Sequence, residues 1–234
     1  MVGKIIDKKE VAQGTLQVTF EVKEDFTFKP GQYIFVTLTK LNYPDERGPK
    51  RQFSIVNSPE DKGKIIITTR ITESGFKKTL NELPQGSEVE LGPIAGAFVL
   101  PDDISRPLVL IAGGIGITPY MSMLRHIQKN NLSYNITLVY SNRNQSSTAY
   151  LNELKQLANQ IPNLKLILTM TDDPNWTGEK RIVDVNFIKE YFPNVNENLY
   201  FVVGPPAMVD AVQRALLEAG VDISSIKIEN FTGY

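Results

Sequence analysis

Residues 108–119 read LVLIAGGIGITP, an apolar run that passes into glycines and then a proline. Such a run is typical of a strand that is buried on both faces of a parallel sheet. Glycines between a strand and a helix let the backbone approach a phosphate, and the helix start offers free N–H groups and a positive dipole end. The stretch therefore predicts a strand, a nucleotide-binding turn and a helix from about Pro119 to Lys129. A packing turn without a ligand explains the glycines about equally well.

The sequence after this stretch continues as alternating apolar strands and helices. Strands are expected at 136–140, 164–170, 199–203 and 226–228, and helices at 149–160, 185–191 and 207–219. Strands of this type, alternating with helices, form a parallel sheet that is covered on both faces. Residues 104–234 are therefore expected to form an α/β Rossmann-like domain.

The sequence before this stretch has a different period. Short strands are expected at 15–22, 33–38, 53–56, 64–71 and 88–91, with one helix at 76–83. Regular short strands with turn residues between them favour a small antiparallel β-barrel. Residues 1–103 are expected to form this barrel domain.

Composition excludes several kinds of chemistry. The 234 residues include 25 Lys and Arg, 26 Asp and Glu, one histidine and no cysteine. A disulfide framework, a cysteine-held metal centre and a thiol nucleophile are therefore excluded in this chain. The single histidine, His126, is expected to be a packing or surface residue, and no metal site is expected.

The sequence also lacks the features of several partners. It shows no basic stripe, so we expect no nucleic-acid partner. It has neither a signal peptide nor an apolar stretch long enough to span a membrane, so a cytoplasmic protein is expected.

A second glycine turn, Gly204-Pro205-Pro206-Ala207-Met208, follows the strand at 199–203. In an open α/β sheet, ligands bind outside the carboxyl ends of the strands, so both glycine turns could face one crevice. A plain strand-to-helix corner is the alternative.

The strand at 136–140 leads into residues 141–147, SNRNQSS, with no carboxylate, and Arg143 there favours a 2′-phosphate and hence NADPH. A solvated loop with an incidental arginine is about as probable.

Two motifs in the barrel half carry polar groups that suit a phosphate. Arg51-Gln52-Phe53-Ser54 falls on an expected strand, with Arg51 and Phe53 on one face and Ser54 on the other. Residues 73–80, ESGFKKTL, place a glycine just before a helix and a threonine in its first turn, which is a second potential anion site.

These motifs, in this order, resemble the ferredoxin–NADP reductase superfamily of flavoprotein oxidoreductases. The resemblance rests on residues 51–54, 75–80, 92–98, 113–119, 204–208 and 229–234 and extends over nearly the whole chain. It implies an FAD-binding barrel followed by an NAD(P)-binding domain. Two departures are Val203, where relatives often have a cysteine, and the 92–98 loop that ends at Phe98.

The resemblance also implies roles for individual residues. Ser54, Glu229 and Phe231 would be the catalytic residues, with Tyr234 an alternative to Phe231 as the aromatic that stacks on the flavin. The residues implied in cofactor binding are Arg51, Phe53, Ser54, Arg70, Gly75, Phe76, Lys78, Thr79, Gly114, Gly116, Thr118, Pro119, Ser141, Arg143, Gly204, Pro205, Met208, Phe231 and Tyr234.

The implied reaction passes hydride from NADPH or NADH to the N5 atom of FAD, with FMN a less favoured flavin. Electrons would then pass to a separate acceptor, either a small molecule or a protein such as ferredoxin, flavodoxin, a haem protein or an oxygenase component. Without cysteines the chain holds no cluster of its own that could take them. The alternatives are a flavin reductase that releases free reduced flavin and a nucleotide-binding module without turnover.

Overall fold

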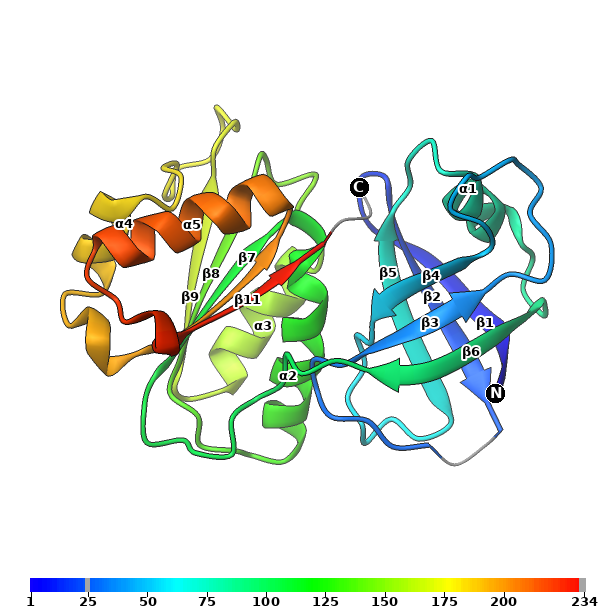
Figure 1. Ribbon diagram of the computed structural model, residues 1–234, viewed down its shortest axis with the longest axis horizontal. Helices are drawn as coiled ribbons and strands as arrows, with labels where there is room; N and C mark the ends of the chain where they lie inside the picture. The colour runs from blue at the N-terminus through cyan, green and yellow to red at the C-terminus, as the bar shows by residue number, and fades with distance from the viewer. Residues whose placement is uncertain (24–25, 232–234) are drawn as a thin grey trace. The chain divides into compact units, whose positions relative to one another are not determined.

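Two units, each with its own hydrophobic core, make up the computed structural model, which describes residues 1–23 and 26–231 (Figure 1). The first unit comprises residues 1–100 and 118–129, and the second comprises the rest. They correspond to the expected antiparallel and parallel halves, so the predicted fold class is confirmed.

The first unit contains a six-stranded antiparallel sheet in the order β4-β3-β6-β1-β2-β5. Its inward-facing side chains, among them Phe20, Ile34 and Phe76, form the core. The elements are β1 (Val2–Ala12), β2 (Thr15–Val22), β3 (Tyr33–Thr37), β4 (Lys50–Ser54), β5 (Lys64–Arg70), α1 (Gly75–Glu82) and β6 (Glu88–Ala95).

Two strands differ from the sequence-based expectation. β1 lies between β6 and β2, yet its sequence is rich in charge and buries only Gly3 and Ile5, so alternation did not reveal it. A side chain at Gly3 would meet Leu91, because its Cβ would lie 2.3 Å from Cδ1 of that leucine. β4 was expected at 53–56 but begins at Lys50, where pairing with β3 already includes Arg51 opposite Val36.

Helix α2 (Ile117–Lys129) contributes Thr118–Lys129 to the first unit. Its Ser122 hydroxyl donates to Asn57 O at 2.7 Å, and its Arg125 donates to Val56 O at 2.9 Å. One turn further on, Lys129 pairs with Asp61. His126 pairs with Glu60 through Nδ1 at 2.9 Å, so the histidine contributes to packing of α2.

The second unit contains a five-stranded parallel sheet in the order β11-β10-β7-β8-β9. Tyr200, Phe187 and Val202 are fully buried members of its core. The remaining elements are β7 (Leu108–Gly113), η1 (Gly114–Gly116), β8 (Ile136–Asn142), α3 (Leu151–Gln160), β9 (Leu164–Met170), α4 (Val185–Tyr191), η2 (Val195–Glu197), β10 (Leu199–Gly204), α5 (Pro206–Glu218), η3 (Ile223–Ser225) and β11 (Ile226–Asn230).

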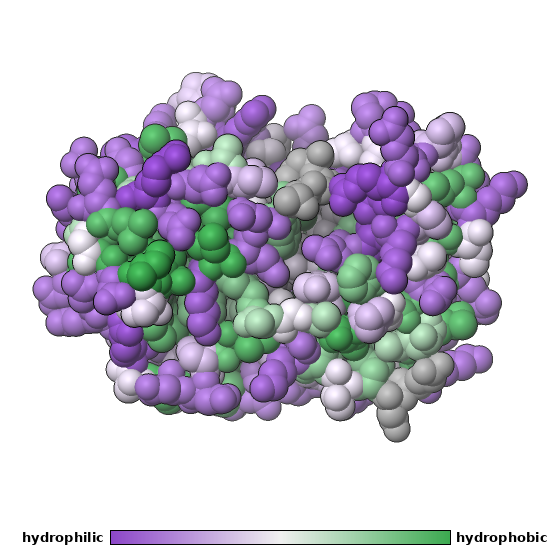
Figure 2. Space-filling view, in the orientation of Figure 1, coloured by the Kyte–Doolittle hydropathy of each residue, from purple (hydrophilic) through white to green (hydrophobic). Residues whose placement is uncertain are grey.

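The second unit exposes several large hydrophobic side chains. Figure 2 shows mostly hydrophilic side chains on the viewed face, with hydrophobic ones gathered around α5 and β11. The exposed large hydrophobic residues of these two elements and of η3 are Leu217, Ile228 and Ile223. Among the described residues, none of the helices is both long and apolar enough to cross a bilayer.

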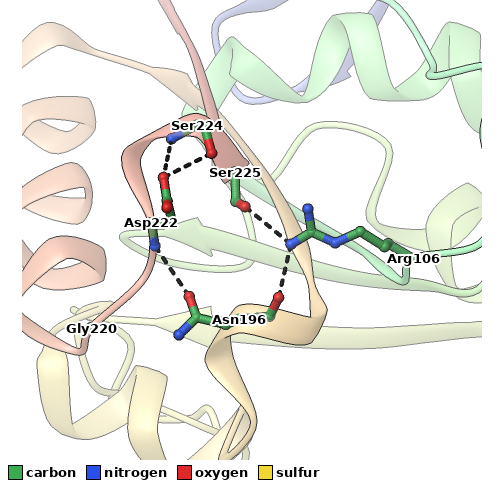
Figure 3. A pocket seen from close by; sticks show the side chains of 6 residues that line it. All are labelled: Arg106, Asn196, Gly220, Asp222, Ser224 and Ser225. Atoms are coloured by element: carbon green, nitrogen blue, oxygen red, sulfur yellow. Dashed lines mark hydrogen bonds between the residues drawn. The ribbon is translucent and has the colours of Figure 1, made fainter.

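An open polar pocket of about 510 Å³ lies at the amino-terminal edge of the parallel sheet (Figure 3). Arg106, just before β7, donates to the carbonyls of Asn196 and Asn198 at 2.9 and 2.6 Å and to the Ser225 hydroxyl at 3.0 Å. The guanidinium thus joins the segments that precede β7, β10 and β11. These contacts make the pocket a structural anchor at the edge away from the glycine turns. The other lining residues are Gly220, Asp222 and Ser224.

Replacing Arg106 is expected to destabilise the second unit. Arg106→Met removes the donors to four partners, which are the carbonyls of Asn196, Glu197 and Asn198 and the Ser225 hydroxyl, and we expect a loss of about 1–3 kcal/mol in the free energy of unfolding. Urea denaturation measures it, with Arg214→Met on the exposed face of α5 as the matched control. Equal stability of the two variants would contradict the anchoring role.

Candidate functional site

The two glycine turns lie together at the carboxyl ends of neighbouring strands β7 and β10. A Cβ on Gly113 would lie 2.1 Å from Met208 Sδ, and one on Gly204 would lie 3.3 Å from Gly113 Cα. A Cβ on Gly116 would lie 2.5 Å from Val203 O. The chain leaves β7 toward β8, on the opposite side from β10, so this edge is a topological switch point. The expectation that both turns face one place is met.

Gly114 has the backbone geometry that a phosphate-binding turn needs. Its φ is +53°, and no other atom lies within 4 Å of the position that a Cβ would take. Its carbonyl accepts a hydrogen bond of 2.9 Å from the Tyr140 hydroxyl, which holds the turn. The open side of Gly114 fits the close approach of a nucleotide phosphate. Thr118 and Pro119 follow in the first turn of α2, where both are buried.

The carboxyl end of β11 brings an acidic group to the same edge. Glu229 lies opposite Val203 in the register with β10, and the N–H of Phe231 donates to Gly204 O at 3.0 Å. Within the described part of the chain, Glu229 Oε2 is buried without a hydrogen-bond partner. Burial raises the pKa of Glu229 to about 7. Tyr234, the alternative stacking aromatic, lies outside the described residues.

The loop after β8 lies beside a carboxylate from another strand. Ser141–Ser147 contains no carboxylate, but the fold brings Asp173, just after β9, to this loop. Its Oδ2 accepts from the backbone N and Nε2 of Gln145 at 3.0 and 3.2 Å, and the backbone hydrogen bond is the main reason that the pKa of Asp173 is lowered. Arg143 is exposed, and its backbone carbonyl accepts a hydrogen bond from the N–H of Asp172 at 2.7 Å. Negative charge therefore lies near the position proposed for a 2′-phosphate.

In the first unit, Arg51 and Phe53 share a face as expected. The Arg51 guanidinium lies 5.3 Å from the centre of the Phe76 ring, and the Phe53 ring centre lies 5.8 Å from it. Ser54 ends β4 with 7% of its surface exposed. Phe76 is fully buried in the core, so only its backbone can reach a cofactor.

The remaining predicted residues of this unit have structural contacts. Arg70 donates to Thr15 Oγ1 at 2.8 Å, and Thr79 is buried and donates to Gly75 O at 2.8 Å. Lys78 is partly exposed and pairs with Glu73 at 2.5 Å. A Cβ on Gly75 would lie 2.3 Å from Pro44 O, so loop packing alone requires that glycine.

Three charged residues near the start of α1 were not predicted from the sequence: Asp45, Arg47 and Lys77. Asp45 accepts hydrogen bonds from the N–H of Phe76 and the hydroxyl of Ser74 and pairs with Arg51. Lys77 is 7% exposed. Burial, together with the positive charges of Arg47 and Arg51, lowers the pKa of Lys77 to about 8. In sequence, Lys77 cannot be told from its exposed neighbour Lys78, and Asp45-Glu46-Arg47-Gly48 reads as an ordinary turn.

These donors fit an anionic cofactor. A bound phosphate would offset the positive charges of Arg47 and Arg51 that disfavour the protonated form of Lys77, and the α1 N-terminus adds backbone donors. Among residues 1–23 and 26–231, no group of three or more His, Asp or Glu side chains could hold a metal ion.

Comparison with known families agrees with this arrangement. Residues 3–99 match the model of the oxidoreductase FAD-binding domain, and residues 110–214 match that of the oxidoreductase NAD-binding domain. The fold and site thus define a two-domain oxidoreductase module for FAD and a nicotinamide nucleotide. The chain belongs to the ferredoxin–NADP reductase family, and the predicted family and cofactor classes are confirmed.

Several characterised proteins are similar to the chain. A flavohemoprotein of Rhodopirellula baltica is 29% identical over 95% of this chain and 59% of its own length. The reductase component 1 of terephthalate 1,2-dioxygenase from Comamonas is 26% identical, over 88% and 60%. The sulfhydrogenase 1 gamma subunit of Pyrococcus furiosus is 30% identical, over 86% and 67%. The chain thus spans about 60% of the length of the first two.

The fold also matches solved structures. A ferredoxin NADP⁺ reductase from Neisseria gonorrhoeae, with FAD and NADP bound, superposes with a TM-score of 0.81 at 19% identity. The superposition covers 98% of each chain.

The buried lysine makes a prediction for stability. Between about pH 8 and 10.5 the unfolded chain keeps the Lys77 proton that the folded protein has lost, so this residue makes folding stability rise with pH. We expect Lys77→Met to remove that rise in urea denaturation of the flavin-free protein. Lys62→Met, at an exposed position, is the control. An unchanged slope in Lys77→Met would contradict the lowered pKa.

The raised pKa of Glu229 predicts the opposite trend. Between about pH 4.5 and 7 the unfolded chain releases the carboxyl proton while the folded protein retains it, so Glu229 makes stability fall as pH rises. Glu229→Gln is expected to lose less stability than the natural protein between pH 5 and 8, whereas exposed Glu218→Gln is not. Parallel curves for the natural protein and Glu229→Gln would show that Glu229 titrates normally.

Proposed function

We propose that this protein is a flavin-dependent NAD(P)H oxidoreductase that passes electrons from a reduced nicotinamide nucleotide, through FAD, to a separate acceptor. The observation that supports this proposal most directly is that one chain contains an FAD-binding domain followed by an NAD-binding domain. This pairing places the binding functions for an electron donor and a redox cofactor in one polypeptide. The name of the Comamonas relative, a reductase component of a dioxygenase, supports an acceptor on another protein.

Binding and orientation are the main tasks of the protein in this proposal. Bound FAD supplies the redox chemistry, since it can accept two electrons and release them singly. Gly114 and Gly116 would receive the pyridine nucleotide with backbone groups, and Met208 would line the same strand edge. Arg51 and the start of α1 would bind the flavin phosphates. Correct placement of donor and acceptor is itself a large part of the rate enhancement in such enzymes.

Each unit also has a residue that would act on the cofactor bound by that unit. The hydroxyl of Ser54, at the end of β4, would donate a hydrogen bond to the flavin. Glu229 would hold or release a proton near neutral pH, which its raised pKa supports. Phe231, next to Gly204 O, would limit access to the ring of the nucleotide.

Anaerobic reduction tests the proposal directly. Purified protein reconstituted with FAD should be yellow, and NADH or NADPH should bleach its absorbance in a single turnover. Ser54→Ala is expected to bind flavin equally well but to be reduced more slowly. Protein that binds neither FAD nor FMN would contradict the oxidoreductase function, while rapid loss of reduced flavin would favour a flavin reductase.

The choice of nucleotide gives a second test. If Arg143 binds a 2′-phosphate, Arg143→Ala should raise the KM for NADPH about tenfold and leave that for NADH nearly unchanged. Steady-state kinetics with both nucleotides measures this, with Arg214→Ala as a control. A larger effect on NADH would instead assign Arg143 to the adenosine or ribose shared by the two nucleotides.

A further inference from the structure

A carboxylate of the chain itself lies on the donors expected to bind the flavin phosphates. Asp45 Oδ2 accepts from Phe76 N–H at 2.9 Å and from the Ser74 hydroxyl at 2.7 Å. Its Oδ1 accepts from Arg47 N–H at 3.0 Å and pairs with the Arg51 guanidinium. The Asp45 and Arg51 side chains are 7% and 8% exposed. Asp45 thus receives charge-assisted and backbone hydrogen bonds of the type that a phosphate oxygen receives.

This contact is more than local helix capping. Ser74 already precedes α1 as its N-cap residue, and its side chain accepts from Lys77 N. Asp45 comes from a loop about 30 positions earlier and accepts from the N–H of Phe76, one of the helix-start donors that lack a partner within the helix. These hydrogen bonds, above all that from Phe76, hold the pKa of Asp45 well below its usual range, so the group stays a carboxylate.

Charge around the carboxylate leaves room for a stronger anion. Among the buried side chains of this region, Arg51 and Lys77 are cations and Asp45 is an anion, while Glu46, Arg47 and Glu73 are exposed. The two buried cations, Arg51 and Lys77, are each more than nine-tenths covered. A pyrophosphate carries more negative charge than one carboxylate, so it would balance the cluster better.

The loop that carries Asp45 is fixed at both ends. Asn42 N–H donates to Thr79 Oγ1 at 3.0 Å, and the Tyr43 hydroxyl donates to Glu82 at 2.5 Å. At the other end, Lys50 begins β4. Between them, Arg51 donates to the carbonyls of Arg47 and Gly48 at 2.9 Å, and Pro49 O accepts from Leu38 N–H at 2.9 Å. Release of Asp45 therefore requires this segment to give up its contacts with Arg51.

From these contacts we infer that Asp45 is an internal competitor of the flavin phosphates: its carboxylate occupies their donors, and flavin binds when residues 44–49 carry it away. The inference rests on the proposed function, since it assumes that the first unit binds flavin through Arg51 and the start of α1. The apparent affinity for flavin is then reduced by the fraction of molecules in which Asp45 holds these donors.

Flavin titrations test the competition. We expect Asp45→Asn and Asp45→Ala to bind FAD and FMN about tenfold more tightly than the natural protein, because they no longer offer a rival anion. Riboflavin, which lacks phosphate, should bind all of them equally. Asp45→Glu keeps a carboxylate and should retain the weaker affinity. Asp61→Asn, which removes a carboxylate paired with Lys129, is the matched control.

Other outcomes separate the two proposals. Weaker FAD binding by Asp45→Asn would overturn the competition and make Asp45 a positioning residue for Arg51. An equal change for riboflavin and FAD would also overturn it, because the effect would not concern phosphate. If neither the natural protein nor any variant binds flavin, the proposed function itself is contradicted, and the competition that rests on it falls with it. Thermal denaturation of each flavin-free variant confirms that it folds, and inhibition of FAD binding by ADP gives a second measure of the phosphate site.

Discussion

The close approach of strands β7 and β10 at their carboxyl ends is the constraint on which the nucleotide half depends. A side chain at Gly113 or Gly116 would collide with Met208 or with the backbone of Val203. Because these positions carry no Cβ, two strand-to-helix turns meet at the point where the chain connections diverge. Parallel pairing with β10 then brings Glu229 to the same edge. One steric condition therefore places backbone donors and a buried carboxyl group together.

The flavin half rests on a different physical balance. Arg51 and Lys77 are both buried, and burying a charge is costly unless it is compensated. Asp45 offsets part of that charge, and it does so through the donors that would receive a phosphate. A cluster of cations strengthens the binding of an anionic cofactor. In the cofactor-free protein, however, the same cluster needs a negative charge nearby to be stable in the folded state. The competition inferred for Asp45 follows from these two requirements.

Strong periodicity explains what could be predicted. The strands at 164–170 and 199–204 and the helix at 185–191 agree with expectation to within one residue, because long apolar runs and amphipathic segments carry unambiguous periods. β1 was missed because a strand with mostly charged residues lacks that signal, although it lies inside its sheet. Asp173 was missed for another reason, since sequence order does not reveal that the end of β9 lies beside residues 143–145.

The sequence by itself determined the two-part architecture and the glycine turns, because periodicity and glycine spacing are local properties. The cofactor classes followed from the resemblance that the order of its motifs carries. Only the tertiary structure decided which charges meet. Asp45 reaches the start of α1 from about 30 residues away, Lys77 is buried while Lys78 is not, and Glu229 has no hydrogen-bond partner for Oε2 among the described residues. The charge state and the partner of an ionisable group depend on its burial and its neighbours, and both are fixed only when distant segments pack.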